Sequence, residues 1–256
     1  MQLDPAALAA GVRLVPLDAV GSTNVEALTR ARAGERGPLW ITALRQTGGR
    51  GRRGRVWESD AGNLYATLLL TNPSPAAKVA QLSFVAALAV HDAVADAAPM
   101  LGPRLSLKWP NDTLCDGKKF CGILLEGEGS SESVVALGIG INCTHHPRGT
   151  TYPATDLGAA GAHVTPAAVF AALSRAMVLR LAQWNRGEGF VATRIDWLKR
   201  AEGLGLPIEA RLNDRETRGV FETIDEAGHL VLRGPEGRRE TIAAADVFPL
   251  HRPEPA

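Results

Sequence analysis

The stretch RLSLKWPNDTLCDGKKFCGILLEGE, residues 104–128, predicts three β-strands in a row. Residues 104–110 alternate between polar and apolar side chains until Pro110, which cannot continue a β-ladder and ends the first strand. Asp116-Gly117 is a dipeptide typical of the tightest hairpin turns, so we expect a β-hairpin over 113–128. The centre of the chain is therefore built from strands joined by short turns.

Helix and strand patterns mix irregularly on both sides of this hairpin. Thr23 and Glu26 have the spacing of a helix capping box, and Thr165-Pro166 is typical of the start of a longer helix. The apolar spacing predicts helices over 22–34, 78–97, 165–189 and 190–202. Strands are predicted over 39–46, 63–70 and 133–142. Because the elements do not alternate as strand, helix, strand, we expect an α+β fold rather than a wound parallel sheet.

The pattern changes after Gly203-Leu204-Gly205. Short strands separated by polar or glycine-containing turns are predicted over 207–212, 217–224, 228–234 and 238–244. Such spacing is typical of a small β-barrel or sandwich. We therefore expect two domains, one over residues 1–204 and a small β domain over 205–256.

The composition narrows the class of protein. The 256 residues are 45% hydrophobic, and 28 basic against 27 acidic side chains leave a net charge of +1, too small for a general nucleic-acid binder. There is no uninterrupted apolar run of 18 residues and no basic, apolar leader. Cys115, Cys121 and Cys143 show no metal-binding spacing, and His145 and His146 are interpreted as loop residues. A reducing, cytoplasmic location fits these features.

The segment GGRGRRGR, residues 48–55, concentrates positive charge in a flexible loop. Glycine lets backbone N–H groups converge on an anion, and arginine adds a planar fork that matches carboxylate and phosphate oxygens. The segment lacks the glycine spacing of standard nucleotide-binding loops. It predicts a cradle for a phosphate or acyl phosphate. The alternatives are a solvated basic loop or an Arg-Gly contact to RNA.

Several polar residues stand at the ends of predicted elements or within the predicted hairpin, where they could face a ligand. In KWPND, residues 108–112, Asn111 could bind a base or phosphate and Asp112 could hold Mg²⁺, although a plain turn is the alternative. In 118–126, alternation puts Lys119 on one face with Cys121 and Ile123, beside Gly122, where it could neutralise a leaving phosphate. The STN cluster, residues 22–24, begins a helix, and Asn142 ends the strand GIGIN.

These motifs together resemble the biotin protein ligases, also called biotin–[acetyl-CoA-carboxylase] ligases. The resemblance rests on GSTN, RQTGGRGRRGRVW, NLY, LKWPND, KKFCGILLE and LGIGIN, which occur in this order between about residues 15 and 145. It implies a mixed sheet flanked by helices, related to class II aminoacyl-tRNA synthetases, followed by a small SH3-like β-barrel. It also implies a two-step reaction. Biotin and ATP, with Mg²⁺, give biotinyl-adenylate and pyrophosphate, and a carrier lysine then takes the biotinyl group and releases AMP.

The resemblance implies a role for each matching residue. Lys119 and Arg52 would be catalytic, Lys119 by bridging the biotin carboxylate and the α-phosphate and Arg52 by holding the intermediate. The residues implied to bind biotin are Ser22, Thr23, Asn24, Gln46, Arg50, Gly51, Arg52 and Lys119. Those implied to bind ATP are Arg53, Trp57, Asn111 and Asn142, with Asp112 as a weaker candidate for the metal. The Gly/Arg segment would close over the adenylate and exclude water.

Three expectations about partners follow from the resemblance. The expected partner is the biotin carboxyl carrier protein or domain of acetyl-CoA carboxylase, and a homodimer is possible. GSTN begins at residue 21, which leaves no room for the DNA-binding domain that many members carry, so we expect a ligase without repressor activity and without a nucleic-acid partner. A lipoate or octanoate ligase of the same fold is the first alternative. An RNA-binding module that uses the Arg-Gly segment is the second.

Overall fold

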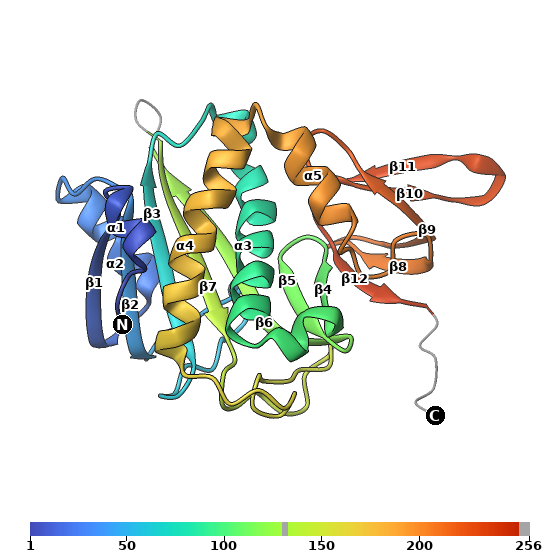
Figure 1. Ribbon diagram of the computed structural model, residues 1–256. Coiled ribbons are helices and arrows are strands. Elements are labelled where there is room, and N and C mark those ends of the chain that lie inside the picture. Colours follow the sequence, from blue (N-terminus) through green and yellow to red (C-terminus); the bar gives the residue numbers. More distant parts are fainter. Residues whose placement is uncertain (130–132, 251–256) are drawn as a thin grey trace.

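The computed structural model describes residues 1–129 and 133–250 and contains one large and one small β-sheet (Figure 1). The large sheet has the strand order β1-β2-β3-β7-β6-β5-β4. Its strands are β1 (Arg13–Val20), β2 (Leu39–Gln46), β3 (Leu64–Thr71), β4 (Leu105–Lys108), β5 (Asp112–Cys115), β6 (Lys118–Glu128) and β7 (Val134–Ile141). β1 and β2 are parallel and the other neighbours antiparallel, so the predicted mixed sheet is confirmed.

Helices cover both faces of the large sheet, because neighbouring residues of each strand point to opposite sides. Trp40 of β2 contributes to the main core with α3 (Leu82–Ala97) and α4 (Pro166–Trp184), and Trp40 packs edge-on against Phe170. Ile41, the next residue, belongs instead to a second core under α2 (Thr23–Arg32). The short helix α1 (Pro5–Ala9) is tied to α4 by the Asp4 N–H, which donates to Ser174.

The segment Ala76–Ala97 is long and apolar enough to cross a membrane by length and composition alone. It consists of a 3-10 turn, η2 (Ala76–Gln81), followed by α3. In the structure, ten residues of α3 are buried, and the helix lies beside α4 on one face of the large sheet (Figure 1). Its apolar character is therefore accounted for by its position in the core.

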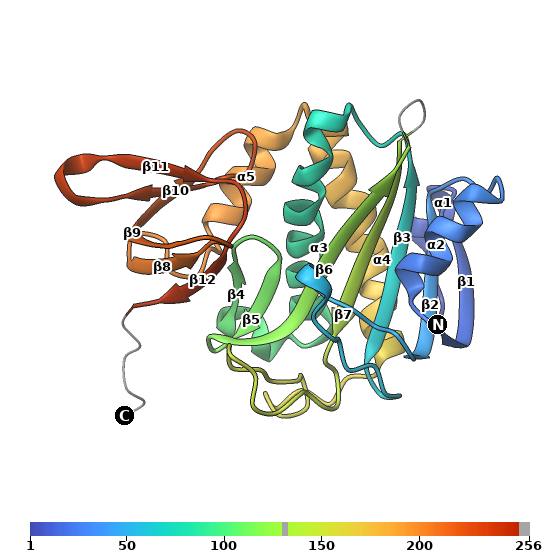
Figure 2. The same cartoon turned by 180° about the vertical axis from the view of Figure 1, so that it is seen from behind.

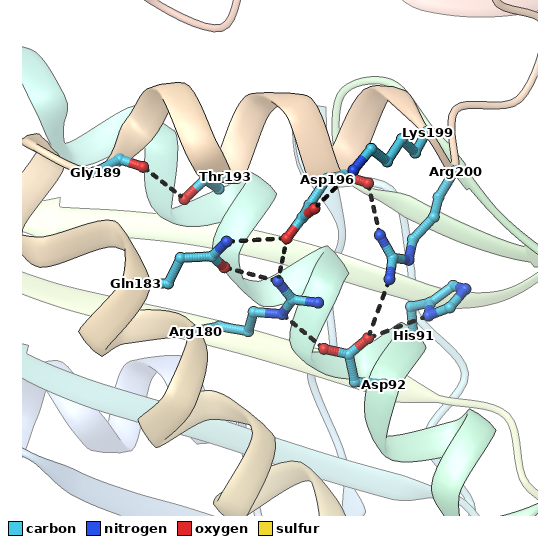
Figure 3. A network of polar contacts seen from close by, with 9 residues as sticks. All are labelled: His91, Asp92, Arg180, Gln183, Gly189, Thr193, Asp196, Lys199 and Arg200. Carbon is cyan, nitrogen blue, oxygen red and sulfur yellow. Dashed lines mark hydrogen bonds and ion pairs between the residues drawn. The ribbon is translucent and has the colours of Figure 1, made fainter.

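A polar network ties the helical layer together (Figure 3). Arg180 of α4 donates to Asp92 of α3 over 2.6 Å and to Asp196 over 2.8 Å. Asp196 lies on α5 (Phe190–Leu198), so one guanidinium joins three helices. Gln183 also donates to Asp196, which leaves this partly buried carboxylate well satisfied.

The predicted hairpin is confirmed, but its face assignment was wrong. Asp116 and Gly117 both have positive φ, 48° and 67°, as the tight turn between β5 and β6 requires. Thr113 pairs with Cys121 and Leu114 with Lys119, so Phe120 is an extra residue in β6. This bulge turns both Phe120 and Cys121 into the main core. Lys119 therefore does not share a face with Cys121 and Ile123, as simple alternation had predicted.

The small sheet is antiparallel throughout and has the order β11-β10-β9-β8-β12. Its strands are β8 (Pro207–Arg211), β9 (Glu216–Ile224), β10 (Leu230–Arg233), β11 (Arg239–Ile242) and β12 (Asp246–Pro249). This arrangement agrees with a small SH3-like β domain. β12 was not predicted, and neither were α1 and β1. α3 ends at Ala97 as predicted, but the other three predicted helices end earlier, α4 because Asn185 adopts a left-handed conformation.

Candidate active site

A cavity of about 460 Å³ lies beside β6 and β7, beneath the connection that carries the Gly/Arg segment. Figure 2 shows this connection, in blue between β2 and β3, crossing in front of β6 and β7 on the side away from α3 and α4. Residues from the start of α2, from the turn between β4 and β5, from the segment 147–154 and from β12 also line the cavity. Segments more than 200 residues apart in the chain therefore meet at one site.

One end of the cavity is lined by neutral polar side chains. The Gln46 carbonyl oxygen accepts from the Thr23 N–H at 2.9 Å and from its hydroxyl at 3.1 Å, and the Gln46 amide donates to Ser59. Asn24 donates to Glu126 and to the Leu124 carbonyl. All of these groups are fixed by hydrogen bonds, so this end of the cavity is organised before any ligand binds.

Thr23 and Glu26 do not form the capping box that their spacing predicted. The helix α2 begins at Thr23, and the side chain of Ser22, its N-cap residue, makes no capping hydrogen bond. The Thr23 hydroxyl is engaged with Gln46 and Thr67 instead. Both side chains line the cavity, so the polar start of α2 faces the site.

Two glycines of β7 make room for side chains at this site. A Cβ atom at Gly138 would lie 2.3 Å from the Asn24 carbonyl oxygen, and one at Gly140 would lie 2.6 Å from Trp57 Nε1. Both distances are shorter than any real Cβ contact, so larger residues would displace Asn24 and Trp57. Trp57 Nε1 is buried and has no hydrogen-bond partner among the described residues. The ring also lies 5.4 Å from Lys119 Nζ.

The cavity is also lined by a buried charge cluster. Asp112 lies between Lys119, with Nζ to Oδ1 at 2.6 Å, and Lys108, with Nζ to Oδ2 at 3.6 Å. Burial alone would raise the pKa of Asp112, but the two ammonium groups outweigh it and hold that pKa below its usual value. Burial lowers the pKa of Lys108, which is only 8% exposed. Two lysines against one carboxylate leave a net positive charge facing the cavity.

The Gly/Arg segment folds as a tight loop over the cavity. Arg50 pairs with Val56, and the Gly51 N–H donates to the Arg55 carbonyl at 2.7 Å. Arg53 and Gly54 turn the chain with φ of 57° and 71°, a region that costs a non-glycine residue free energy. Arg52 points inward and donates to Asn111 at 3.2 Å, and burial lowers the pKa of its guanidinium.

The structure gathers nearly all of the predicted site residues around this one cavity. The predicted residues that line it are Ser22, Thr23, Asn24, Gln46, Arg50, Gly51, Arg52, Trp57, Asn111, Asp112, Lys119 and Asn142. Arg53 does not line it and pairs with Asp246 instead. Its predicted contact to ATP therefore has no support in the structure, since the turn at Arg53 directs the side chain away.

Several lining residues were not predicted, notably Lys108, Arg55, Tyr152, Asp246 and Phe248. Lys108 Nζ lies 4.4 Å from the centre of the Tyr152 ring and 5.9 Å from that of Phe248. Lys108 has a local signal, because it stands four residues before Asp112 in KWPND. Arg55 lies in the Gly/Arg segment that the sequence singled out as a whole, whereas Tyr152, Asp246 and Phe248 lie on segments distant in sequence and carry no comparable signal.

The described residues do not fit a magnesium ion held by the protein. Asp112, the predicted ligand, is compensated by two lysines, and Asp246 by two arginines. Within residues 1–129 and 133–250, no group of three His, Cys, Asp or Glu side chains is placed to hold a metal. Because Mg²⁺ commonly binds through substrate phosphates and water, we assign it no protein ligand and no step.

The cysteines do not contribute a nucleophile to this site. All three are free and buried, and none lines the cavity. Burial raises the pKa of Cys143 to about 12 and also raises the pKa values of Cys115 and Cys121. Their thiols therefore stay protonated at neutral pH.

Comparisons with known proteins place this architecture in a family. Residues 22–143 match the biotin/lipoate A/B protein ligase family, and residues 203–248 match the biotin protein ligase C-terminal domain. The chain belongs to the biotin protein ligase family.

Individual relatives agree with this assignment. The chain is 46% identical to a biotin–[acetyl-CoA-carboxylase] ligase of Paracoccus denitrificans, over 89% of this chain and 96% of the relative. It is 33% identical to the enzyme of that name from Mycobacterium tuberculosis, over 90% and 86%. The structure of the biotin protein ligase from Aquifex aeolicus in complex with biotin and ATP is similar, with a TM-score of 0.77, 27% identity and coverage of 93% and 99%.

Proposed function

We propose that this protein is an ATP-dependent ligase that activates biotin and transfers it to a lysine of a biotin carboxyl carrier protein. The observation that carries the proposal is the single cavity itself. One end of this cavity is neutral and polar and includes the hydrogen-bonded side chains of Thr23 and Gln46. The other end is positively charged and is formed by Lys108, Lys119 and Arg52. A small polar acid and the phosphates of a nucleotide are complementary to these two ends.

In the first step, a carboxylate oxygen of biotin attacks the α-phosphorus of ATP and the bond to the β-phosphate oxygen breaks. Pyrophosphate leaves, and biotinyl-adenylate remains. Lys119 lines the cavity beside Gly122 and is assigned to both carboxylate and α-phosphate, because a fixed ammonium stabilises charge that grows on the phosphoryl oxygens. Lys108 and Arg52 add positive charge on the same side. Asp112 holds the two lysines in place through its ion pairs.

In the second step, the neutral amine of a carrier lysine attacks the acyl carbon of the anhydride. The bond to the phosphate oxygen breaks, AMP leaves, and the amine gives up a proton to form the amide. The Gly/Arg loop covers the cavity and keeps water from the anhydride before the carrier arrives. The Trp57 side chain lines the cavity, and its buried Nε1–H packs against Gly140.

The polar end of the cavity favours biotin over lipoate. The ureido ring of biotin has N–H donors and a carbonyl acceptor that hydroxyl and amide side chains can match, and the dithiolane ring of lipoate has neither. A site built for hydrogen bonds rejects an analogue that lacks them, because its own polar groups are then left unpaired. Membership of the ligase family also removes the basis for the RNA-binding alternative.

Exchange of labelled pyrophosphate into ATP tests this selectivity. We expect exchange that depends on biotin and is at least about 10²-fold weaker with lipoate or octanoate. Equal or greater exchange with lipoate would keep the fold and the chemistry but change the acid.

The expected partner is the biotin carboxyl carrier domain of an acetyl-CoA carboxylase, because the similar ligases of Paracoccus denitrificans and Mycobacterium tuberculosis carry that enzyme in their names. The free, buried thiols support the proposed cytoplasmic location. A homodimer stays a prediction, which light scattering coupled to size-exclusion chromatography can test.

A further inference from the structure

The tip of the Gly/Arg loop is held by the C-terminal β domain. Arg53 Nη1 lies 3.1 Å from Asp246 Oδ2, and Arg55 Nη2 lies 2.8 Å from Asp246 Oδ1. One carboxylate therefore binds the two arginines that flank Gly54, one through each oxygen. Arg52, beside them, approaches the carbonyl of Ala245 at 3.5 Å.

The base and the tip of this loop are anchored in different ways. At the base, backbone groups bond to the end of β1, with Thr47 N–H donating to Val20 and Gly48 N–H to Gly21. At the tip, the contacts to the C-terminal domain are made by arginine side chains and reach across more than 190 residues of sequence. The base is thus fixed by the sheet, whereas the tip is held by side-chain contacts, of which the two ion pairs to Asp246 are the charged ones.

Asp246 is well placed to hold the loop. It is the first residue of β12, where it pairs with Arg211 of β8, so its backbone is fixed by the small sheet. Its side chain is 23% exposed and lines the cavity. Burial opposes its charge, but Arg55, Arg53 and Arg52 together lower its pKa. The carboxylate is therefore charged at neutral pH and committed to the loop.

We propose that Asp246 is a positioning residue that closes the Gly/Arg loop over the reactive intermediate, so that the C-terminal domain controls retention of the acyl-adenylate. The role in retention rests on the proposed function, while closure of the loop does not. Without the carboxylate, Arg53 and Arg55 lose their shared partner, and the positive charges of these two residues and Arg52 repel one another. The loop then opens, and water and free amines reach the anhydride.

Trypsin measures loop closure directly, because the loop presents arginine bonds that are cleaved only when it opens. In the full-length Asp246→Asn protein without substrates, we expect cleavage between residues 50 and 56 to be roughly threefold to tenfold faster, as two partly exposed ion pairs are lost. Glu222→Gln is the matched control, because Glu222 also binds two arginines of the same domain but does not line the cavity. Unchanged cleavage of the Asp246→Asn loop would overturn the proposal.

Retention of the adenylate is measured separately, as biotinyl-adenylate released to solvent per pyrophosphate formed. We expect this ratio to rise roughly threefold to tenfold in Asp246→Asn, to return to normal in Asp246→Glu and to stay normal in Glu222→Gln. A structural role alone would lower stability without changing this ratio. A ratio unchanged in Asp246→Asn would refute the role in retention. If no variant forms adenylate from biotin, the proposed function fails, but the trypsin result still decides loop closure.

A double-mutant cycle checks that Asp246 acts through the arginines. We expect Asp246→Asn to increase the rate of trypsin cleavage less in a protein that already carries Arg53→Gln and Arg55→Gln than in the wild type. Full additivity would mean that the carboxylate acts elsewhere, and would count against the proposal.

Discussion

Lys119 owes its place to a local irregularity of the backbone. The extra residue at Phe120 turns the chain so that Lys119 faces Gly122 and Asp112, while Cys121 enters the core. Residue type and motif were enough to single out Lys119 from the sequence. The residues that surround Lys119 could not be predicted in this way, because a bulge leaves no signature in an alternating pattern. Lys108 was missed for a similar reason, since its burial between Asp112 and Tyr152 depends on the fold.

Replacement of Lys119 tests its role in adenylation. We expect Lys119→Ala to slow pyrophosphate exchange by about 10²-fold or more, the scale of losing one preorganised charge. Lys118→Ala is the matched control, because that side chain is exposed on the same hairpin. Near-normal exchange in Lys119→Ala would remove this residue from the reaction.

Arg52 is predicted to act on the intermediate. We expect the Arg52→Gly variant to form the adenylate but to release it. The guanidinium of Arg52, which donates to Asn111 in the structure, is then no longer present to hold the phosphate. The measurement is nonspecific biotinylation of an added bystander protein, detected by mass spectrometry. A variant that retains its adenylate as tightly as the wild type would contradict this role.

At the scale of elements, β7 illustrates what a pattern can and cannot predict. Its apolar run predicted a buried strand, and the strand is observed. The purpose of its two glycines became visible only when Asn24 and Trp57 were placed against them. β1 was missed because Pro16 and Asp18 interrupt its alternation. It is an edge strand that pairs only with β2, where such residues are tolerated.

The glycine in β7 gives a prediction about ligand binding. We expect Gly140→Ala to weaken biotin binding at least about fivefold, because the new methyl group would displace Trp57 at a cost typical of overpacking. Isothermal titration calorimetry measures this. Gly102→Ala is the control, since its Cβ would meet Ala95 at an ordinary 3.7 Å. Equal affinity in the two variants would show that the Trp57 position is not required.

The network that joins three helices makes a prediction about stability and pH (Figure 3). Burial alone raises the pKa of Asp92, but hydrogen bonds from His91 and Arg180 outweigh it and lower that pKa. A lowered carboxyl pKa stabilises the fold above the unfolded value, about 3.9, and this stabilisation is lost as pH falls through the folded value. We expect Asp92→Asn to cost about 1 kcal/mol between pH 5 and 8, and less below about pH 4.

Urea denaturation at each pH measures this difference in the free energy of unfolding. Asp96→Asn is the matched control, because Asp96 joins the same two helices through Arg175 but is 56% exposed. It should cost less than about 0.5 kcal/mol. Equal costs for the two substitutions, or a cost for Asp92→Asn that does not depend on pH, would mean that the network adds nothing beyond a surface pair.

At the scale of the whole molecule, the site is shared by parts of the chain that local patterns treat separately. The change of pattern near residue 205 predicted a small β domain, and the small sheet is observed. That this sheet would bring Asp246 and Phe248 to the cavity could not be predicted, because contacts over more than 190 residues leave no local signal. The fold class and most of the site were readable from motifs, whereas their closure by the C-terminal domain required the structure.

The account stands on the transfer of biotin to a carrier, and intact mass spectrometry tests that most directly. A biotin carboxyl carrier domain would be incubated with this protein, ATP, Mg²⁺ and either biotin or lipoate. We predict a mass increase of one biotinyl group that requires ATP and is absent with lipoate. A lipoyl adduct would contradict the assigned acid, and no adduct together with no pyrophosphate from either acid would contradict the ligase itself.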